Sequence, residues 1–211
     1  ETIEDTLLEI TGLSLSDIDV NQSEDGKLGI VLSVSSGTLS LGSVEGLSFY
    51  DNNGVSSFYE EGRSLNIKGS LESLNFSLEG LLYNPDVNFN GSDNLSIKVS
   101  DFGNTGDGDL EEAIEIDITV NVISMNDLPQ STPIEDQVVF ERFLISLDFS
   151  ENFSDNDSTP LTFGASGYPS SLSFDSTTGI LSGTLEENDV GGYLVSITAI
   201  DGDDDSITVT E

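Results

Sequence analysis

Apolar and polar residues alternate with a period of two along most of this chain. The clearest alternations cover residues 95–99, 114–122, 143–149 and 193–199. Successive side chains of a β-strand point to opposite faces, so this period predicts strands that bury one face. Clusters of Gly, Asn, Asp and Ser, residues that favour turns, separate the alternating segments. Many short strands joined by turns predict an antiparallel β-sandwich.

One segment has a helical period instead. In GSLESLNFSLEGL, Leu71, Leu74 and Leu78 are spaced by three and four residues, which places them on one face of a helix. The sequence therefore predicts an all-β chain with at most a short helix near 70–80.

A change of composition divides the chain. Residues 125–135, MNDLPQSTPIE, contain two of the five prolines and no apolar alternation, and they follow the long alternating segment that ends near Ile123. Such a segment is typical of a domain boundary. We expect one sandwich over 1–125, a linker over 126–133 and a second sandwich over 134–211.

The two halves share a plan. IEDTLLEI, LSDIDV and IKVSDFGN follow one another in the first half, and IEDQVVF, FSDNDS and ITAIDGDD follow in the same order in the second. Internal similarity of this kind is typical of tandem repeats. We therefore expect the sequence to be a piece of a longer array of such domains.

Composition excludes several classes of partner and chemistry. Forty Asp and Glu against five Lys and Arg give a formal net charge of −35, so nucleic acid and anionic membranes are not partners. No run of eighteen apolar residues is present, so we expect no direct membrane insertion. Without His or Cys, Ser-His and Cys-His nucleophiles are excluded, and the only catalytic arrangement left is a carboxylate pair, for which the sequence offers no aromatic-lined cleft. We expect no enzyme.

The acidic residues of the second half are expected to meet at one end of its sandwich. Loops from three parts of a sandwich lie at that end, and the linker arrives there too. The residues concerned are Asn126, Asp127, Glu135, Asp136, Asp155, Asp157, Asp201 and Asp203. Ligands that are all oxygen favour Ca²⁺, because zinc prefers His or Cys and magnesium requires a stricter octahedron. The pattern predicts a calcium site.

Two alternatives remain open at this point. Asp and Asn are common turn residues, and most carboxylates on an acidic surface are simply solvated. The run NTGDGDLEE, with Asp107, Asp109 and Glu111, is either a second ion site or a solvated hairpin tip.

The second half resembles a known family. FSDND, YPSSLSFDSTTGILSGT and DVGGYLVSITAIDGD are similar to the dystroglycan-type cadherin-like domain of bacterial surface proteins, over about residues 132–211. The first half, with LSLSDIDV, SSGTLSLGSVEGLSF and VNVISMNDLP, resembles the cadherin-like repeats of large bacterial adhesins, which are related to the repeats of chondroitin sulfate proteoglycans, over about 1–129. The resemblance implies two tandem Ig-like or cadherin-like sandwiches.

The resemblance also implies a ligand set. The cadherin linker motif corresponds to Asn126 and Asp127, its Asp-x-Asp pair to Asp155 and Asp157, and its late-strand aspartate to Asp201. The equivalent upstream set is Asp17, Asp19 and Asp101, with Glu4 and Asp5 where the first strand begins. The sequence departs from the family at Ser158 and Thr159, which replace the usual Gly-Asp, and at Leu128, where cadherins often have Asn.

These observations favour one function and leave a second open. The first is a calcium-rigidified extender or adhesion segment of a long extracellular bacterial protein, secreted or on the cell surface. Its partners would be neighbouring cadherin-like domains of the same chain. The alternative is a recognition module of an adhesin that binds a carbohydrate or a peptide, with a cell-surface glycan or protein as partner.

Overall fold

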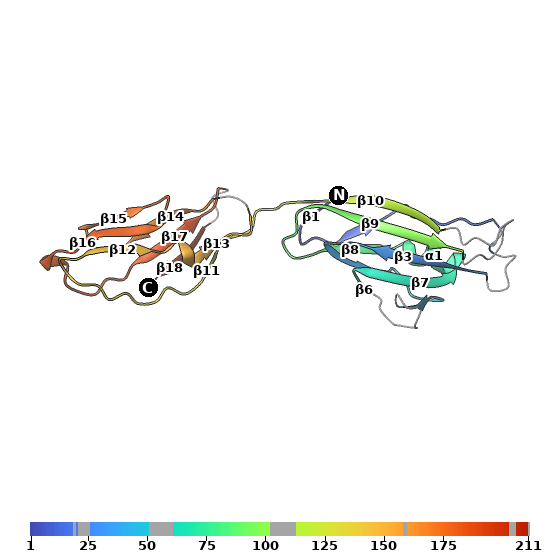
Figure 1. Ribbon diagram of the computed structural model, residues 1–211, viewed down its shortest axis with the longest axis horizontal. Helices are drawn as coiled ribbons and strands as arrows, with labels where there is room; N and C mark the ends of the chain where they lie inside the picture. The colour runs from blue at the N-terminus through green and yellow to red at the C-terminus, as the bar shows by residue number, and fades with distance from the viewer. Residues whose placement is uncertain are drawn as a thin grey trace. The chain divides into compact units, whose positions relative to one another are not determined.

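The computed structural model describes residues 1–18, 20, 26–50, 61–101, 113–157, 160–202 and 206–210. Contacts divide the chain into two compact units, Glu1–Met125 and Asn126–Glu211, which we call unit 1 and unit 2. Each is described by itself. Figure 1 shows that both are built from strands, with a single α-helix, α1, among the described residues. The all-β prediction is therefore confirmed.

Unit 1 is a sandwich of two sheets. A six-stranded sheet has the order β1-β10-β9-β3-β7-β5, and a four-stranded sheet has the order β2-β8-β4-β6 among the described residues. The strands are β1 Thr2–Ile3, β2 Leu8–Ile10, β3 Lys27–Ser33, β4 Gly37–Ser40, β5 Ser48–Phe49, β6 Glu61–Gly62, β7 Ser64–Ser70, β8 Leu81–Pro85, β9 Gly91–Ser100 and β10 Ala113–Ile123.

The core of unit 1 is formed by the inward positions of both sheets. Fully buried side chains come from β3, β4, β7, β8 and β9, and they include Ile30, Leu39, Ile67, Tyr83 and Leu95. The alternation of the sequence selects these positions, because every second residue of a paired strand faces the opposite sheet. Burial of this apolar surface is the main stabilising contribution, at about 25 cal/mol per Å².

The helix α1, Leu71–Leu78, confirms the prediction of a short helix near 70–80. Its N-cap is Ser70, whose hydroxyl oxygen accepts a hydrogen bond from the Ser73 backbone N–H at 3.1 Å. Leu74 and Leu78 are buried on its inner face. In Figure 1, α1 lies at the end of unit 1 opposite to β1.

Unit 2 is a smaller sandwich. Its described strands form the sheets β12-β16-β15 and β14-β17-β18 and the pair β11-β13. Their bounds are β11 Gln130–Ser131, β12 Leu144–Asp148, β13 Phe153–Ser154, β14 Thr162–Ser166, β15 Leu172–Asp175, β16 Ile180–Thr184, β17 Ser196–Ile200 and β18 Ser206–Thr210. Two 3₁₀ turns, η2 Ser150–Asn152 and η3 Glu187–Asp189, connect strands.

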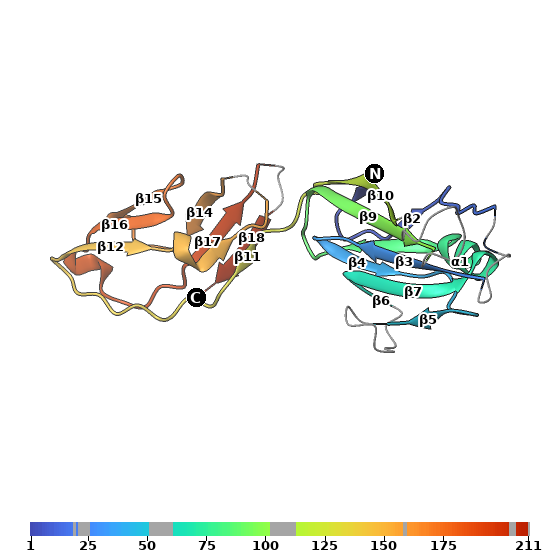
Figure 2. The ribbon, with the colours of Figure 1, turned by 45° about the vertical axis from the view of Figure 1, so that its right-hand side comes forward.

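Aromatic and aliphatic side chains fill the space between these sheets. The rings of Phe153 and Phe163 lie 5.9 Å apart at an angle of 59°, and Leu181, Ile197 and Ala199 are buried beside them. The segment between β11 and β12 contains no described strand. Figure 2 shows it as a long coil that runs along one side of the unit from β11 to β12.

Candidate metal centre

Strand pairing brings the first residues of unit 2 next to the Asp-x-Asp pair. β11 and β13 are antiparallel, with Gln130 opposite Ser154, so the residues before β11 lie beside the residues after β13. As a result, the backbone N–H of Asp127 donates a hydrogen bond to Oδ2 of Asp157 at 2.6 Å. The side-chain amide of Asn156 lies 3.5 Å from Oδ2 of Asp127 and donates to it.

Asp201 joins this cluster from the end of β17. Its residue is only 4% exposed, and its Oδ2 accepts a hydrogen bond from the Asn126 side-chain amide at 3.0 Å. Burying a carboxylate is costly unless charged or polar groups compensate it. The contact with Asn126 supplies part of that compensation. It also connects the last turn of unit 2 to the first residue of the unit.

Asp155 is the member of the cluster whose environment is incomplete. Its Oδ1 accepts a hydrogen bond from the Asp157 backbone N–H at 2.7 Å, a contact that closes the turn after β13. Its Oδ2 is buried and has no hydrogen-bond partner among the described residues. An unsatisfied buried oxygen of this kind costs roughly 1 to 3 kcal/mol, and more when it is charged, and binding of a cation would offset that cost.

The donor set fits a hard cation. Asn126, Asp127, Asp155, Asp157 and Asp201 offer carboxylate and amide oxygens, the ligands that Ca²⁺ takes. In the conformation described, however, no three His, Cys, Asp or Glu side chains of the described residues are grouped closely enough to hold a metal ion. The oxygens of Asp157 and Asp201 accept hydrogen bonds from Asp127 and Asn126 instead. Asp203, Ser158 and Thr159 lie outside the described residues.

Glu135 and Asp136 are not part of this cluster, in contrast to the expectation from the sequence. The sequence places them at the start of the first strand of unit 2, but that strand, β11, begins five positions earlier, at Gln130. Because β11 and β13 are antiparallel, the chain after Ser131 runs away from Asp155, as the hydrogen bond from the Thr132 N–H to the Asn152 oxygen shows. Both acidic residues are exposed on the segment between β11 and β12.

The acidic residues predicted for the upstream set lie at opposite ends of unit 1. Asp101 follows Ser100, which pairs with Ala113 at the start of β10, whereas Glu4 follows Ile3, which pairs with Ile123 at its end. Asp101 is therefore separated from Glu4 and Asp5 by the length of β10.

Asp17 has a local structural role on the same unit. Its Oδ1 accepts a hydrogen bond from the Val20 N–H at 2.9 Å, which closes a turn. Asp19, Asp107, Asp109 and Glu111 lie outside the described residues, so the structure does not place the rest of these acidic groups. The upstream ion site stays a prediction.

Glu4 is a buried carboxylate of unit 1. It lies near the end of β10, after which the chain continues into unit 2. It is 5% exposed, its Oε1 accepts a hydrogen bond from the Met125 backbone N–H, and its Oε2 accepts one from the Asn90 side-chain amide at 3.3 Å. Glu4 thus holds the last residue of unit 1 in place. The family resemblance places Glu4 with the upstream ligand set, and the sequence does not indicate this contact with Met125.

Sequence reasoning missed Asp93, a deeply buried aspartate of unit 1. It is 2% exposed and accepts hydrogen bonds from Ser35 N (3.0 Å), Ser35 Oγ (2.6 Å), Ser36 N (2.8 Å), Asn94 N (2.7 Å) and the Tyr83 hydroxyl (3.0 Å). Burial raises the pKa of Asp93, but the hydrogen bonds from Ser35, Ser36 and Asn94 outweigh it and hold the pKa below its usual value. A signal was present, because Asp93 occupies an inward position two residues before Leu95.

Comparison with known proteins supports an Ig-like fold for unit 2. The family model described as a putative Ig domain matches residues 129–210. No curated protein matches the chain.

Solved structures with which the chain aligns include extracellular cadherin domains. Mouse cadherin-23 EC22–24 is 15% identical with a TM-score of 0.42, over 86% of this chain and 52% of that one. Protocadherin gamma B2 cadherin domains 1–5 are 13% identical with a TM-score of 0.46, over 99% and 36%. An endo-fucoidan hydrolase of glycoside hydrolase family 107 is 18% identical with a TM-score of 0.35, over 86% and 22%. The chain thus spans about half or less of the length of each.

The strands and the sheet orders define two β-sandwiches in tandem along the chain, and the family match supports an Ig-like domain for unit 2. Within the part of the chain that the structure describes, no helix is long and apolar enough to cross a membrane.

Proposed function

We propose that the chain is a calcium-binding extender segment of an extracellular adhesion protein, in which Ca²⁺ binds where unit 2 begins. Asn126, Asp127, Asp155, Asp157 and Asp201 would hold the ion. The observation that carries the proposal is the buried Oδ2 of Asp155, which has no hydrogen-bond partner among the described residues although it lies in an acidic turn.

A divalent cation resolves the electrostatic conflict in this cluster. Two carboxylates about 4 Å apart repel each other by on the order of 4 kcal/mol at an effective dielectric of 20, and a shared cation removes that cost. To bind the cation, the carboxylates of Asp157 and Asp201 would give up the hydrogen bonds that they accept from the Asp127 N–H and the Asn126 side-chain amide. Asn126 would then present its side-chain carbonyl oxygen to the ion. We therefore expect calcium to reorganise the residues before β11 as it binds.

The position of Asn126 and Asp127 in the chain explains what the ion does. Asn126 directly follows Met125, the last residue of unit 1. An ion that holds Asn126 and Asp127 on unit 2 restrains the segment by which the two units are joined, and contacts between domains are otherwise usually small and mobile. Calcium would thereby fix the orientation of neighbouring modules, which are the expected partners. No catalytic step is needed.

Extracellular modules bind calcium with dissociation constants of about 10⁻⁴ to 10⁻³ M, which suits a secreted or surface location where calcium is abundant. The charge of −35 is compatible with such a location because salt screens self-repulsion. A bacterial adhesin is the parent protein that the sequence motifs favour.

Isothermal titration of the chain with CaCl₂ tests the proposal. We expect binding in the range above, and we expect Asp155→Asn with Asp157→Asn to abolish the tightest site. The matched control, Glu135→Gln with Asp136→Asn, removes the same charge from the same unit and should leave that site unchanged. If both double variants lose calcium affinity equally, calcium is attracted non-specifically to an acidic surface, and the assignment of the site is overturned.

Small-angle scattering in chelator and in calcium tests the mechanical part. We expect the unmodified chain to show a narrower distribution of interatomic distances in calcium, and the Asp155→Asn, Asp157→Asn variant to show no change. Identical profiles for the unmodified chain, despite a bound ion, would separate calcium binding from any role as an extender.

A further inference from the structure

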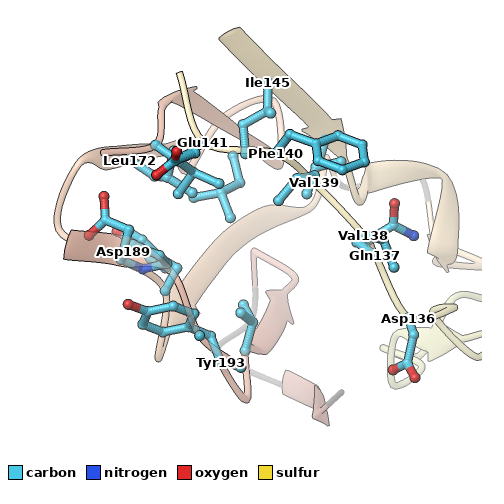
Figure 3. Close-up of a pocket in the computed structure, with 18 of the residues that line it drawn as sticks. Asp136, Gln137, Val138, Val139, Phe140, Glu141, Ile145, Leu172, Asp189 and Tyr193 are labelled. Atoms are coloured by element: carbon cyan, nitrogen blue, oxygen red, sulfur yellow. The ribbon is translucent and has the colours of Figure 1, made fainter. Parts of the chain in front are cut away.

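Unit 2 contains a large apolar groove that the calcium proposal does not use. A cavity of about 820 Å³ lies between residues 134–141, which we call the strap, and the loop 186–193. Figure 3 shows the strap residues from Asp136 to Phe140 on one side of the opening, and Asp189 and Tyr193 on the other. Its floor consists of apolar side chains of the core, Ile145, Leu147, Leu172, Leu181, Val195 and Ile197, which all line the cavity. This volume lies in the range of ligand sites, roughly 300 to 1,000 Å³.

Apolar side chains around the opening are left in water. Val138 is 84% exposed and Phe140 71%, and Val190 and Tyr193 across the groove are also exposed. Several large apolar residues gathered at one opening mark an interaction site, whereas scattered ones do not. The occupant must therefore carry apolar side chains that reach the floor.

The backbone of the strap favours an extended occupant. Within the described residues, no strap N–H donates to a carbonyl of another segment, and the next such bond is from the Arg142 N–H to the Leu185 oxygen at 2.8 Å. The Glu135 carbonyl oxygen of the strap accepts a hydrogen bond from the Gln137 side-chain amide at 2.8 Å. An extended chain whose N–H groups pair with no other segment is a template to which a peptide adds as a strand, with main-chain hydrogen bonds for affinity and alternate side chains for specificity.

Charge identifies the chemistry of that peptide. Six carboxylates line the opening, those of Glu135, Asp136, Glu141, Glu186, Glu187 and Asp189. Arg142 is the only Lys or Arg in residues 126–211, and it lies near Glu187 (3.4 Å) and Glu141 (3.9 Å). A second copy of this strongly acidic chain would place like charges together, so it is disfavoured. Lys or Arg side chains on the occupant would complement the opening.

We propose that the groove of unit 2 binds an extended basic peptide segment of a partner protein. Alternate apolar side chains of the peptide enter the cavity over Ile145 and Leu181, and its Lys or Arg side chains face the carboxylates of the strap and of the loop 186–193. The strap backbone pairs with the peptide. This inference is independent of calcium, because the groove uses none of Asn126, Asp127, Asp155, Asp157 and Asp201.

The test is titration of the chain, in chelator, with a blocked ten-residue peptide that alternates leucine and lysine. The control peptide has glutamate in place of lysine. We expect saturable one-to-one binding of the first peptide that weakens as salt rises, and binding of the second that is at least about tenfold weaker. Equal affinity for both peptides, or no binding of either, would overturn the proposal.

Paired variants locate the site. Glu135→Gln with Asp136→Asn should weaken binding of the basic peptide by about two- to fivefold per carboxylate removed. Asp155→Asn with Asp157→Asn removes the same charge from unit 2 and should leave peptide affinity unchanged. If both double variants weaken binding equally, the peptide is attracted only by net charge and the groove is not its site.

Amide hydrogen exchange distinguishes an open groove from one that the strap itself fills. We expect fast exchange of residues 134–141 in the free chain and slow exchange with peptide bound. The contrary result is slow exchange without peptide, together with NMR contacts that place the Val138 and Phe140 side chains against Leu181. It would show that the strap packs onto the core of its own unit. That result would contradict the proposal even for a variant that folds normally.

Discussion

Two acidic side chains, Asp93 in unit 1 and Asp155 in unit 2, show how differently a buried carboxylate can be accommodated. Asp93 accepts hydrogen bonds from Ser35, Ser36, Asn94 and the Tyr83 hydroxyl, so both of its oxygens are satisfied by neutral donors. Asp155 accepts one backbone hydrogen bond at Oδ1, and its buried Oδ2 accepts none among the described residues.

The difference separates a structural carboxylate from a candidate ligand. A carboxylate whose lone pairs are all used by the fold stabilises that fold and has nothing left for an ion. A carboxylate with an unused, buried oxygen destabilises the protein until a cation or another donor arrives. The two residues therefore require different experiments. The role of Asp93 is tested by substituting it, and the role of Asp155 by comparing stability with and without added calcium.

The largest effect is expected from Asp93→Ala. The change removes the acceptor of the Ser35 and Ser36 backbone N–H groups, and hydrogen bonds to a charged group contribute about 1.5 to 3 kcal/mol each. We expect the free energy of unfolding of unit 1 to fall by about 3 kcal/mol or more, with or without calcium. Thermal unfolding followed through the amide signals of β3 and β9 measures it.

Tyr83→Phe is the graded control for that experiment. It removes one donor to Asp93 and keeps the others, so the loss should be about 1 to 2 kcal/mol. A loss for Asp93→Ala that depends on calcium would contradict the structural role and would place Asp93 with the ligands.

A smaller effect on the stability of unit 2 is expected from Asp155→Asn, and its sign should differ between chelator and calcium. In chelator the substitution removes an uncompensated charge, so unit 2 should be unchanged or more stable by up to about 1 kcal/mol. Calcium at 10 mM should stabilise the unmodified chain by about 1.4 to 2.7 kcal/mol, the linkage for dissociation constants of about 10⁻³ to 10⁻⁴ M. In that buffer the variant should be the less stable protein, by this amount minus any stability that it gains in chelator. Differential scanning calorimetry under both conditions gives the two values.

The control for this sign change is Glu151→Gln, an exposed carboxylate of unit 2 that lies in η2. We expect differences within about 0.5 kcal/mol in either buffer. If Asp155→Asn is destabilising to the same extent in chelator and in calcium, its Oδ2 is satisfied by the protein and the contrast with Asp93 disappears.

The sequence predicted the fold well because the alternation of apolar residues is a direct consequence of two-sided strands. The positions of β9, β10 and β12 and the helix α1 follow from that pattern and from the spacing of Leu71, Leu74 and Leu78. β11 was not predicted, since Gln130 and Ser131 carry no apolar side chain and pair only through the backbone.

That missed strand explains the misplacement in the candidate site. With the first strand of unit 2 expected later in the chain, Glu135 and Asp136 were grouped with Asp155, whereas β11 directs them to the strap. Asp127 and Asp157, which the sequence also grouped, do meet, and the unpredicted pair of β11 and β13 brings them together. The role of Asp93 depends on Ser35 and Ser36, which are nearly sixty positions away in the sequence. The sequence alone therefore shows an aspartate at an inward strand position but does not identify its hydrogen-bond donors.

The smallest expected effect is on the pH dependence of the stability of unit 1 in acid, and it tests the contrast between Asp93 and Asp155 most finely. Because the folded state holds the pKa of Asp93 below the value of about 3.9 for an unfolded aspartate, its contribution is fully present above about pH 4 and is lost as pH falls through the folded pKa. In chelator, the unmodified chain should therefore lose stability in unit 1 more steeply below pH 4 than Asp93→Asn, which is less stable at neutral pH. Denaturant unfolding between pH 2.5 and 6 measures both slopes (expected difference up to about 1.4 kcal/mol per pH unit for one proton). Parallel curves for the two proteins would mean that the hydrogen bonds of Ser35 and Ser36 do not favour the charged form, and Asp93 would then resemble Asp155 more than the structure indicates.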